Sequence, residues 1–176
     1  MKKHLLFPLI DDRQIKSVRA GDEVEISGTI YVARDAAHKK LADALNKNKP
    51  LPLPLKGSII YYMGPTPAPP GKIIGSCGPT TSSRMDKYTL PLLQSGLKAT
   101  MGKGGRSEEI AAGCKKYKAV YLIAYGGCGA YLNRFVKKSE CFAYCELGPE
   151  AIYKLEVKGF PAIAGIDIKG KNIYNK

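Results

Sequence analysis

The chain lacks the features of a membrane or secreted protein. No apolar run approaches the length of about 20 residues that crosses a bilayer. The apolar start, residues 4–10, is interrupted by Pro8 and followed by Asp11, Asp12 and Arg13 without a small-residue cleavage site, so it does not match a secretory signal. The sequence therefore predicts a cytoplasmic protein that does not associate with a membrane.

CxxC pairs are also missing. The odd count of five cysteines and the absence of that motif argue against a disulfide framework and a zinc knuckle. Cys141 and Cys145 form a single CxxxC pair, but two thiolates do not hold an iron–sulfur cluster, which normally takes four. We expect no metal site in this chain, and we expect most of the cysteines to be buried free thiols.

Acidic residues are scarce: 15 Asp and Glu face 28 Lys and Arg, which gives a net charge of +13. This charge attracts anionic partners or substrates without choosing among them. Because the lysines are scattered along the chain, they indicate a solvated surface more than a polybasic arm. The phosphate-binding pattern GxxxxGK[ST] is absent, so no nucleotide site is predicted. The length of 176 residues suits one domain, residues 1–176, with its own core.

The first part of the chain is rich in β-strand patterns. Residues 22–33 alternate apolar and polar side chains, which predicts a half-buried strand. Asp35 is then expected to cap a helix whose apolar stripe contains Ala37, Leu41, Ala44 and Leu45. Residues 58–63 read as a second strand, and residues 64–71 read as a rigid loop.

Repeated strand, glycine turn and helix units follow. The expected strands cover residues 72–76, 98–101, 119–125, 139–145 and 160–168. The expected helices begin near Arg84, with a kink or a break at Pro91, then include Ile110, Cys114 and Tyr117, and then cover residues 130–137. This order predicts an α/β domain with several loops at the carboxyl ends of its strands, where such folds place their sites.

Three of these loops have polar residues that packing does not require. Arg34, Asp35 and His38 follow the first strand, and an arginine there needs a carboxylate, from Asp35 or from a ligand. Residues 78–84 place four hydroxyls and Arg84 at a helix start, and residues 102–107 place Lys103 and Arg106 at another. Together the cations point to an anion with two carboxylates. The competing interpretation is a basic RNA face with Tyr61, Tyr62 and Tyr121, although no stacking motif frames them.

These loops resemble the β subunit, or C-terminal domain, of class I iron–sulfur fumarate hydratase and of L(+)-tartrate dehydratase. The matching segments occur in family order across nearly the whole chain, and the RDAAH and GPTT…RMD segments are specific to it. They are residues 28–38 (GTIYVARDAAH), 75–86 (GSCGPTTSSRMD), 103–107 (KGGRS), 146–152 (ELGPEAI) and 160–162 (FPA).

The resemblance implies a swivelling β/β/α domain that closes over a [4Fe–4S] cluster held by three cysteines of an α subunit. It implies that Thr80 is the catalytic base, that Arg34 and Arg84 bind substrate carboxylates, and that Lys103 is the active-site lysine, after a spacing one residue shorter than expected. Further substrate-binding candidates are Thr81 and Arg106, and Asp35 and His38 belong to the motif without an assigned step.

The resemblance predicts a hydro-lyase that is active only with its α subunit, as a heterodimer or heterotetramer, on a small dicarboxylate substrate. Interconversion of L-malate and fumarate is the first expectation, and L(+)-tartrate dehydration is the alternative. A basic module that kept the fold and binds nucleic acid or a protein partner without catalysis is the alternative from another class. Nucleic acid binding is not expected, since Thr80, Arg84, Lys103 and Arg34 are all kept.

Overall fold

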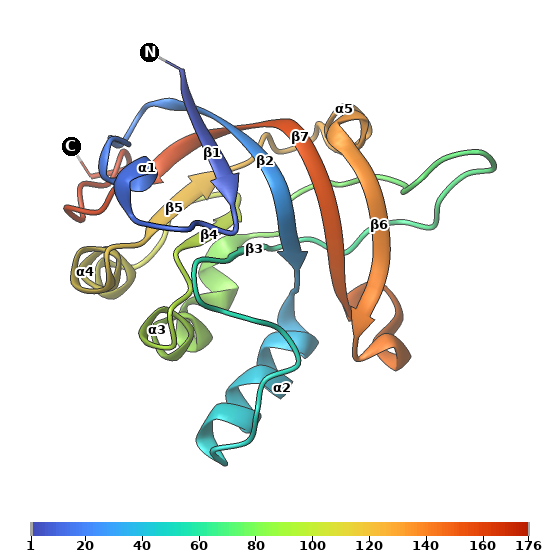
Figure 1. The fold of residues 1–176 in the computed structure, drawn as a ribbon, viewed down its shortest axis with the longest axis horizontal. Helices are drawn as coiled ribbons and strands as arrows, with labels where there is room; N and C mark the ends of the chain where they lie inside the picture. The colour runs from blue at the N-terminus through green and yellow to red at the C-terminus, as the bar shows by residue number, and fades with distance from the viewer. Residues whose placement is uncertain (1, 176) are drawn as a thin grey trace.

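Five strands close into a barrel in the computed structural model, which describes residues 2–175 (Figure 1). Four of them run parallel, and the last is antiparallel to both of its neighbours and closes the ring. In order these strands are β2 (Glu23–Val32), β3 (Ile59–Tyr61), β4 (Ala99–Gly102), β5 (Val120–Ile123) and β7 (Ile152–Ile166). Two further strands extend the sheet, β1 (Lys3–Phe7) beside β2 and β6 (Val136–Ala143) beside β7.

The length of β7 explains the closure. It pairs along one edge with β2, from Tyr153 opposite Val32 to Ile163 opposite Glu23, while the last part of its other edge pairs with β5. Apolar side chains fill the barrel, among them the fully buried Ile26, Leu122 and Phe160. The prediction of a single domain of mixed α/β content is confirmed, and the barrel is its central element.

Three helices lie along one side of the barrel (Figure 1): α2 (Asp35–Asn46), α3 (Asp86–Gln94) and α4 (Glu108–Tyr117). A second apolar cluster, which includes Leu41, Tyr62 and Leu92, joins α2 and α3 to the sheet. The remaining helical segments are short: α1 (Arg13–Lys16), α5 (Gly129–Leu132) and the 3-10 turns η1 (Ser82–Met85), η2 (Asn133–Phe135) and η3 (Cys145–Glu150). Among the described residues no helix combines the length and the apolar character needed to cross a membrane.

Three predicted elements are wrong in detail. Residues 72–76 form no strand, because this loop folds back on itself and the Ser76 amide donates to the Thr66 hydroxyl. The predicted helix over 130–137 ends at Leu132, and β6 begins at Val136. Pro91 does not break α3, since it lies on the exposed face, where water can satisfy the carbonyl that its missing N–H leaves free.

Asp35 is not the N-cap of α2. Arg34 occupies that position without a side-chain cap, and Asp35 begins the helix with its carboxylate turned to two arginines. The helix stripe is buried at Ala37, His38 and Leu41 and becomes half-buried at Ala44 and Leu45.

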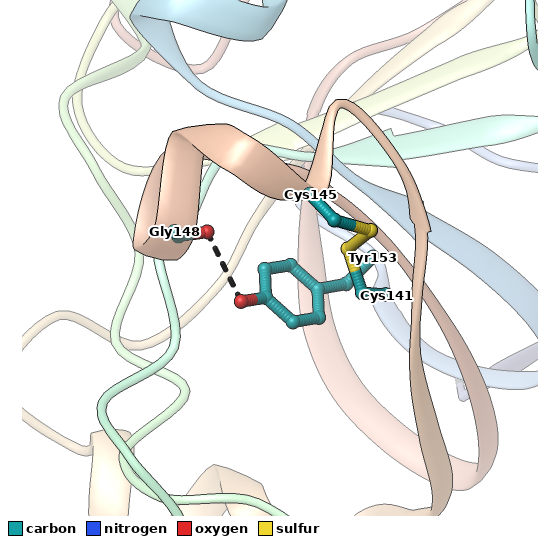
Figure 2. Close-up of a disulfide and its surroundings, with 4 residues drawn as sticks. All are labelled: Cys141, Cys145, Gly148 and Tyr153. Atoms are coloured by element: carbon teal, nitrogen blue, oxygen red, sulfur yellow. Dashed lines mark hydrogen bonds between the residues drawn. A yellow bond between two sulfur atoms is a disulfide. The ribbon is translucent and has the colours of Figure 1, made fainter.

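The cysteine prediction is correct for Cys77 and Cys114, which are buried free thiols, but Cys128 is exposed. Cys141 and Cys145 are disulfide-bonded, against the expectation from the odd count (Figure 2). The chain turns back between β6 and η3 at Tyr144, whose φ is +55°, and this turn brings the two Cα atoms to 5.9 Å. Spacing along the sequence contains no information about that turn.

Candidate functional site

The candidate site lies at the carboxyl edge of the parallel strands β2, β3 and β4. Residues 80–82 run alongside the end of β4 like a short extra strand. The Thr80 amide donates to the Tyr62 carbonyl at 2.7 Å, the Lys103 amide donates to the Thr80 carbonyl at 3.1 Å, and the Ser82 amide donates to the Lys103 carbonyl at 2.9 Å. The backbone therefore places Thr80, Thr81 and Lys103 side by side, although the two threonines and the lysine lie far apart in the sequence.

The side chains of these three residues are free to meet a ligand. Lys103 is exposed and forms no ion pair with any residue from 2 to 175. Thr80 is half-buried and Thr81 is exposed, and neither hydroxyl has a hydrogen-bond partner within the described part of the chain. The two threonine hydroxyls and the Lys103 ammonium group are therefore available to a ligand.

Arg84 is held by Asp35 in a two-pronged ion pair. Its Nε donates to Asp35 Oδ1 at 3.0 Å, and its Nη2 donates to Asp35 Oδ2. The hydrogen bond from Arg84 lowers the pKa of Asp35, so this carboxylate is ionised at neutral pH. Because Asp35 takes the Nε–Nη2 edge, the Nη1–Nη2 edge of the guanidinium stays available, and the side chain is 46% exposed. Asp35 thus orients Arg84 while leaving it one edge for an external carboxylate.

Arg34 lies on the other side of Asp35. Its Nε is 3.5 Å from Asp35 Oδ2 and 3.2 Å from Glu150 Oε1. This Nε is buried, and among residues 2–175 no acceptor is aligned well enough to form a hydrogen bond with it. The second oxygen of Glu150 accepts the Ala36 amide at 3.1 Å. Two arginines and two carboxylates therefore form one network, which keeps both guanidinium groups at the same edge of the barrel.

His38 lies behind this network and does not reach the surface. Its side chain is fully buried, its Nδ1 is 2.9 Å from the Arg34 carbonyl, and its ring packs edge-on against Tyr62. Burial lowers the pKa of His38 to about 4, so the ring is neutral at neutral pH. With Nδ1–H donating to Arg34, the ring supports the backbone of Arg34 from inside the fold.

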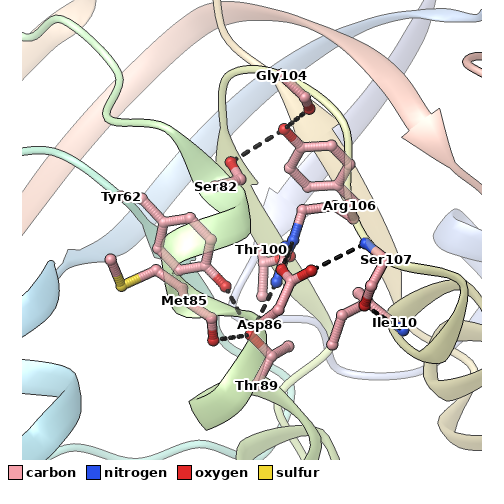
Figure 3. Close-up of polar contacts among 11 residues, drawn as sticks. Tyr62, Ser82, Met85, Asp86, Thr89, Thr100, Gly104, Arg106, Ser107 and Ile110 are labelled. Carbon is pink, nitrogen blue, oxygen red and sulfur yellow. Dashed lines mark hydrogen bonds and ion pairs between the residues drawn. The ribbon is translucent and has the colours of Figure 1, made fainter.

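Arg106 is also inside the fold, and Figure 3 shows its polar contacts. Its side chain has no exposed surface, and its Nε pairs with Asp86 Oδ1 at 2.5 Å. Its Nη1 donates to Thr100 and its Nη2 donates to Thr89. A substrate at the surface does not meet this guanidinium, in contrast to the prediction that Arg106 binds substrate. Arg106 instead joins the residues that support the two loops.

Asp86 and Glu150 were not singled out from the sequence. Asp86 accepts from Arg106 and, through Oδ2, from the Ser107 amide at 2.8 Å, so it ties the start of α3 to the start of α4. Glu150 holds Arg34 and the first turn of α2. Both lie inside segments that carry the family resemblance, and that position was the signal available in the sequence.

The tyrosines that the alternative of a basic RNA face requires are not at the surface. Tyr61, Tyr62 and Tyr121 are completely buried, and Tyr121 Oη lies 2.7 Å from the Gly104 carbonyl. Stacking of bases requires exposed rings. These tyrosines therefore cannot form such a platform.

The described residues of this chain do not fit an iron–sulfur cluster. Among residues 2–175 no group of three or more His, Cys, Asp or Glu side chains is arranged to hold a metal ion. Burial raises the pKa values of Cys77 and Cys114 to about 12, so both thiols stay protonated. We therefore derive no step through a cluster held by this chain.

Comparison with known proteins gives the family. The family model described as Fumarase C-terminus matches residues 6–176. Fumarate hydratase 2 of Leishmania major is 42% identical over 167 residues, which are 93% of this chain and 29% of that protein. Fumarate hydratase class I, anaerobic, of Escherichia coli K12 is 42% identical over 93% of this chain and 30% of its own length.

The chain thus spans less than a third of the length of these fumarate hydratases. L(+)-tartrate dehydratase subunit beta of Escherichia coli K12 is 35% identical over 98% of this chain, and here the match covers 87% of the relative. The extent of the family match and the level of identity lead to one conclusion: this chain belongs to the family of the fumarase C-terminus.

Proposed function

We propose that this chain is the β subunit of a two-chain hydro-lyase that removes water reversibly from a 2-hydroxy-dicarboxylate. A relative named as a separate beta subunit matches almost end to end, which supports an enzyme assembled from two chains. In this proposal an α subunit holds the [4Fe–4S] cluster, and the present domain swivels over it in a cytoplasmic heterodimer or heterotetramer. The observation that carries the proposal is the group of exposed Arg84, Lys103 and Thr81 with half-buried Thr80, beside Arg34.

The substrate has two carboxylates, and the site has two arginines at one edge. The free edge of Arg84 matches the planar fork of a carboxylate, and Arg34 supplies the second cation. Asp35 lies between the two guanidinium groups and keeps them apart. We assign one substrate carboxylate to each arginine.

Dehydration requires that a proton leave one carbon while the hydroxyl leaves its neighbour. We assign proton removal to Thr80, whose hydroxyl is unpartnered within the described chain. A threonine hydroxyl is a weak base, so it needs cations that stabilise its alkoxide. Lys103 is an adjacent cation without an ion pair among the described residues, and the hydrogen bond from its amide to the Thr80 carbonyl keeps the two residues next to each other. A cluster held by the α subunit would supply the Lewis acid for the departing hydroxyl.

Two acids fit this arrangement. L-Malate is the first choice, because the relatives at 42% identity are named fumarate hydratases. L(+)-Tartrate is the second, because the relative covered over 87% of its length is a tartrate dehydratase subunit. The two substrates differ by one hydroxyl, and none of the residues assigned here distinguishes it.

The test is anaerobic turnover of L-malate and L(+)-tartrate by this chain, alone and mixed with its cluster-bearing partner. Activity is expected only in the mixture, and the preferred acid names the enzyme. Activity of the chain alone would contradict the two-chain assembly. Inactivity of a formed, cluster-loaded complex with both acids would contradict the proposed substrates and favour the non-catalytic binding module.

Lys103→Met and Lys115→Met form a matched pair for this assay, since both lysines are exposed. Lys103→Met is expected to lower turnover by at least about 100-fold, the range of a lost acid–base or electrostatic contribution. Lys115 lies in the last turn of α4, and its replacement should leave turnover unchanged. Equal activity of the two variants would remove Lys103 from the site.

A further inference from the structure

The disulfide between Cys141 and Cys145 lies where the chain passes from β6 to η3 (Figure 2). Both residues are exposed, so a reductant in solution can reach the bond. Exposed disulfides are the labile kind that exchange with thiols, whereas buried ones resist reduction. The buried thiols of Cys77 and Cys114 do not compete, because burial raises their pKa values to about 12.

The segment that follows the disulfide contacts the candidate site. In η3, Glu146 pairs with Lys40 of α2, and Glu150 contacts both Arg34 and the Ala36 amide. The Ala36 amide belongs to the first turn of α2, where no earlier carbonyl of the helix can accept it. Glu150 is therefore the acceptor for that amide and a neighbour of the Arg34 guanidinium at once.

From this connection we propose that Cys141 and Cys145 are a reversible thiol–disulfide site whose redox state sets the position of Glu150 and, through it, of Arg34. The effect on η3 and α2 follows from the contacts of this chain alone. Its consequence for substrate binding rests on the proposed function, because only there does Arg34 bind a carboxylate.

The co-reactant is a dithiol. One of its thiolates attacks a sulfur of the pair, the Sγ–Sγ bond breaks, and a mixed disulfide forms. The second thiol of the reagent then displaces the remaining cysteine. The two cysteines gain two electrons and two protons and become free thiols, and the reagent becomes a cyclic disulfide. Reoxidation is the same exchange in reverse, with a disulfide as the oxidant.

Reduction removes the disulfide that ties the two sides of the turn at Tyr144 together. That residue has a φ of +55°, a left-handed conformation that a tyrosine seldom adopts, so the turn relaxes when the tie is broken. Two contacts keep η3 in place: the Tyr153 hydroxyl of β7 donates to the Gly148 carbonyl at 3.0 Å, and Lys40 of α2 still pairs with Glu146. Loosening of η3 with the fold intact is the expected reduced state.

Hydrogen exchange of the full chain, with and without dithiothreitol, tests the proposal. Alkylation in denaturant and intact mass first count the free thiols, three in the oxidised chain and five after reduction, in agreement with three free cysteines and one disulfide. The Ala36 amide is then expected to exchange at least about threefold faster after reduction, since its acceptor is freed. Equal exchange in the two states, or five free thiols under all oxidising conditions, overturns the proposal.

Two variants separate the disulfide from a general effect of the reductant. The Cys141→Ser/Cys145→Ser double variant should show the fast Ala36 exchange without dithiothreitol and no further response to it. Cys128→Ser removes the exposed free thiol and should respond as the unmodified chain does. A response that persists in the double variant overturns the assignment to this pair.

A kinetic arm addresses the site itself. In the assembled enzyme, reduction is expected to raise KM at least about threefold while kcat changes less, because Arg34 is assigned to binding. If the enzyme turns over neither acid, the proposed function fails while the exchange result stands. If turnover is normal and Ala36 exchange does not respond, the redox site fails and the proposed function stands.

Discussion

Replacement of Arg106 gives the sharpest test of how the site is supported. The Arg106 side chain is fully buried and Asp86 is 17% exposed, so Arg106→Met leaves a largely buried carboxylate without its cation. Loss of one partner of a buried ion pair costs about 3–5 kcal/mol. Because Asp86 keeps some contact with water, we expect the lower end of that range. For a chain of 176 residues this corresponds to a fall in Tm of about 6–12 °C.

Thermal unfolding of the isolated chain, followed by circular dichroism, measures this fall. Arg134→Met is the matched control, since Arg134 is exposed and has no ion pair among residues 2–175, and it should shift Tm by less than about 2 °C. The double variant Arg106→Met/Asp86→Asn should lose less stability than the sum of the two single variants, because it leaves no unpaired charge inside the fold. A Tm for Arg106→Met equal to that of the control would refute the buried pair.

Three further predictions concern the other residues of the network. Asp35→Asn should lower kcat/KM of the assembled enzyme at least about tenfold, because Arg84 is no longer oriented. The same change should alter the unfolding free energy by less than about 1 kcal/mol, because the ion pair is exposed. An unchanged kcat/KM would contradict the orienting role of Asp35. The pKa of His38 is about 4 in the folded chain and 6.5 in the unfolded chain. The His38 contribution to the unfolding free energy is therefore fully present above pH 6.5, and the unfolding free energy measured by urea titration should fall by about 2 kcal/mol from pH 7 to pH 5. His38→Asn should remove that fall. Gly102→Ala would place a methyl group 2.1 Å from a serine hydroxyl and should destabilise by about 1–3 kcal/mol, whereas Gly126→Ala meets only ordinary contacts and should be near neutral in the same titrations.

Periodicity located most of the fold because its signals are local. The alternation in residues 22–33 predicted β2, and the stripe through Ile110 and Cys114 predicted α4. The idea that loops gather at the carboxyl ends of parallel strands was also confirmed, since β2, β3 and β4 are parallel neighbours. Closure of the barrel depends on pairing between Glu23–Val32 and the end of the chain, and no local pattern encodes such a long-range contact.

The site was harder to predict for the same reason. The sequence identified the cations and suggested Asp35 as a partner of Arg34, but it did not pair Asp35 with Arg84 and did not identify Asp86 or Glu150. Arg84 and Arg106 stand in similar glycine- and serine-rich loops, yet Asp35 leaves Arg84 half exposed while Asp86 keeps Arg106 inside. That difference depends on which residues pack around each guanidinium. A count of charged residues near a helix start therefore cannot predict which arginine is exposed and which is buried.

The exposure of the site also bears on the proposed need for a second chain. Arg84 and Lys103 face water here, and in water two unit charges 4 Å apart interact by only about 1 kcal/mol. At the effective dielectric of a covered protein site the same pair interacts by about 4 kcal/mol. A threonine alkoxide needs stabilisation of the second kind, because the hydroxyl of Thr80 is otherwise far too weak an acid at neutral pH. In the proposed two-chain enzyme, covering by the partner surface therefore does more than deliver a cofactor. It removes water from the cations, and only then can Lys103 and Arg84 support the proposed proton removal at Thr80.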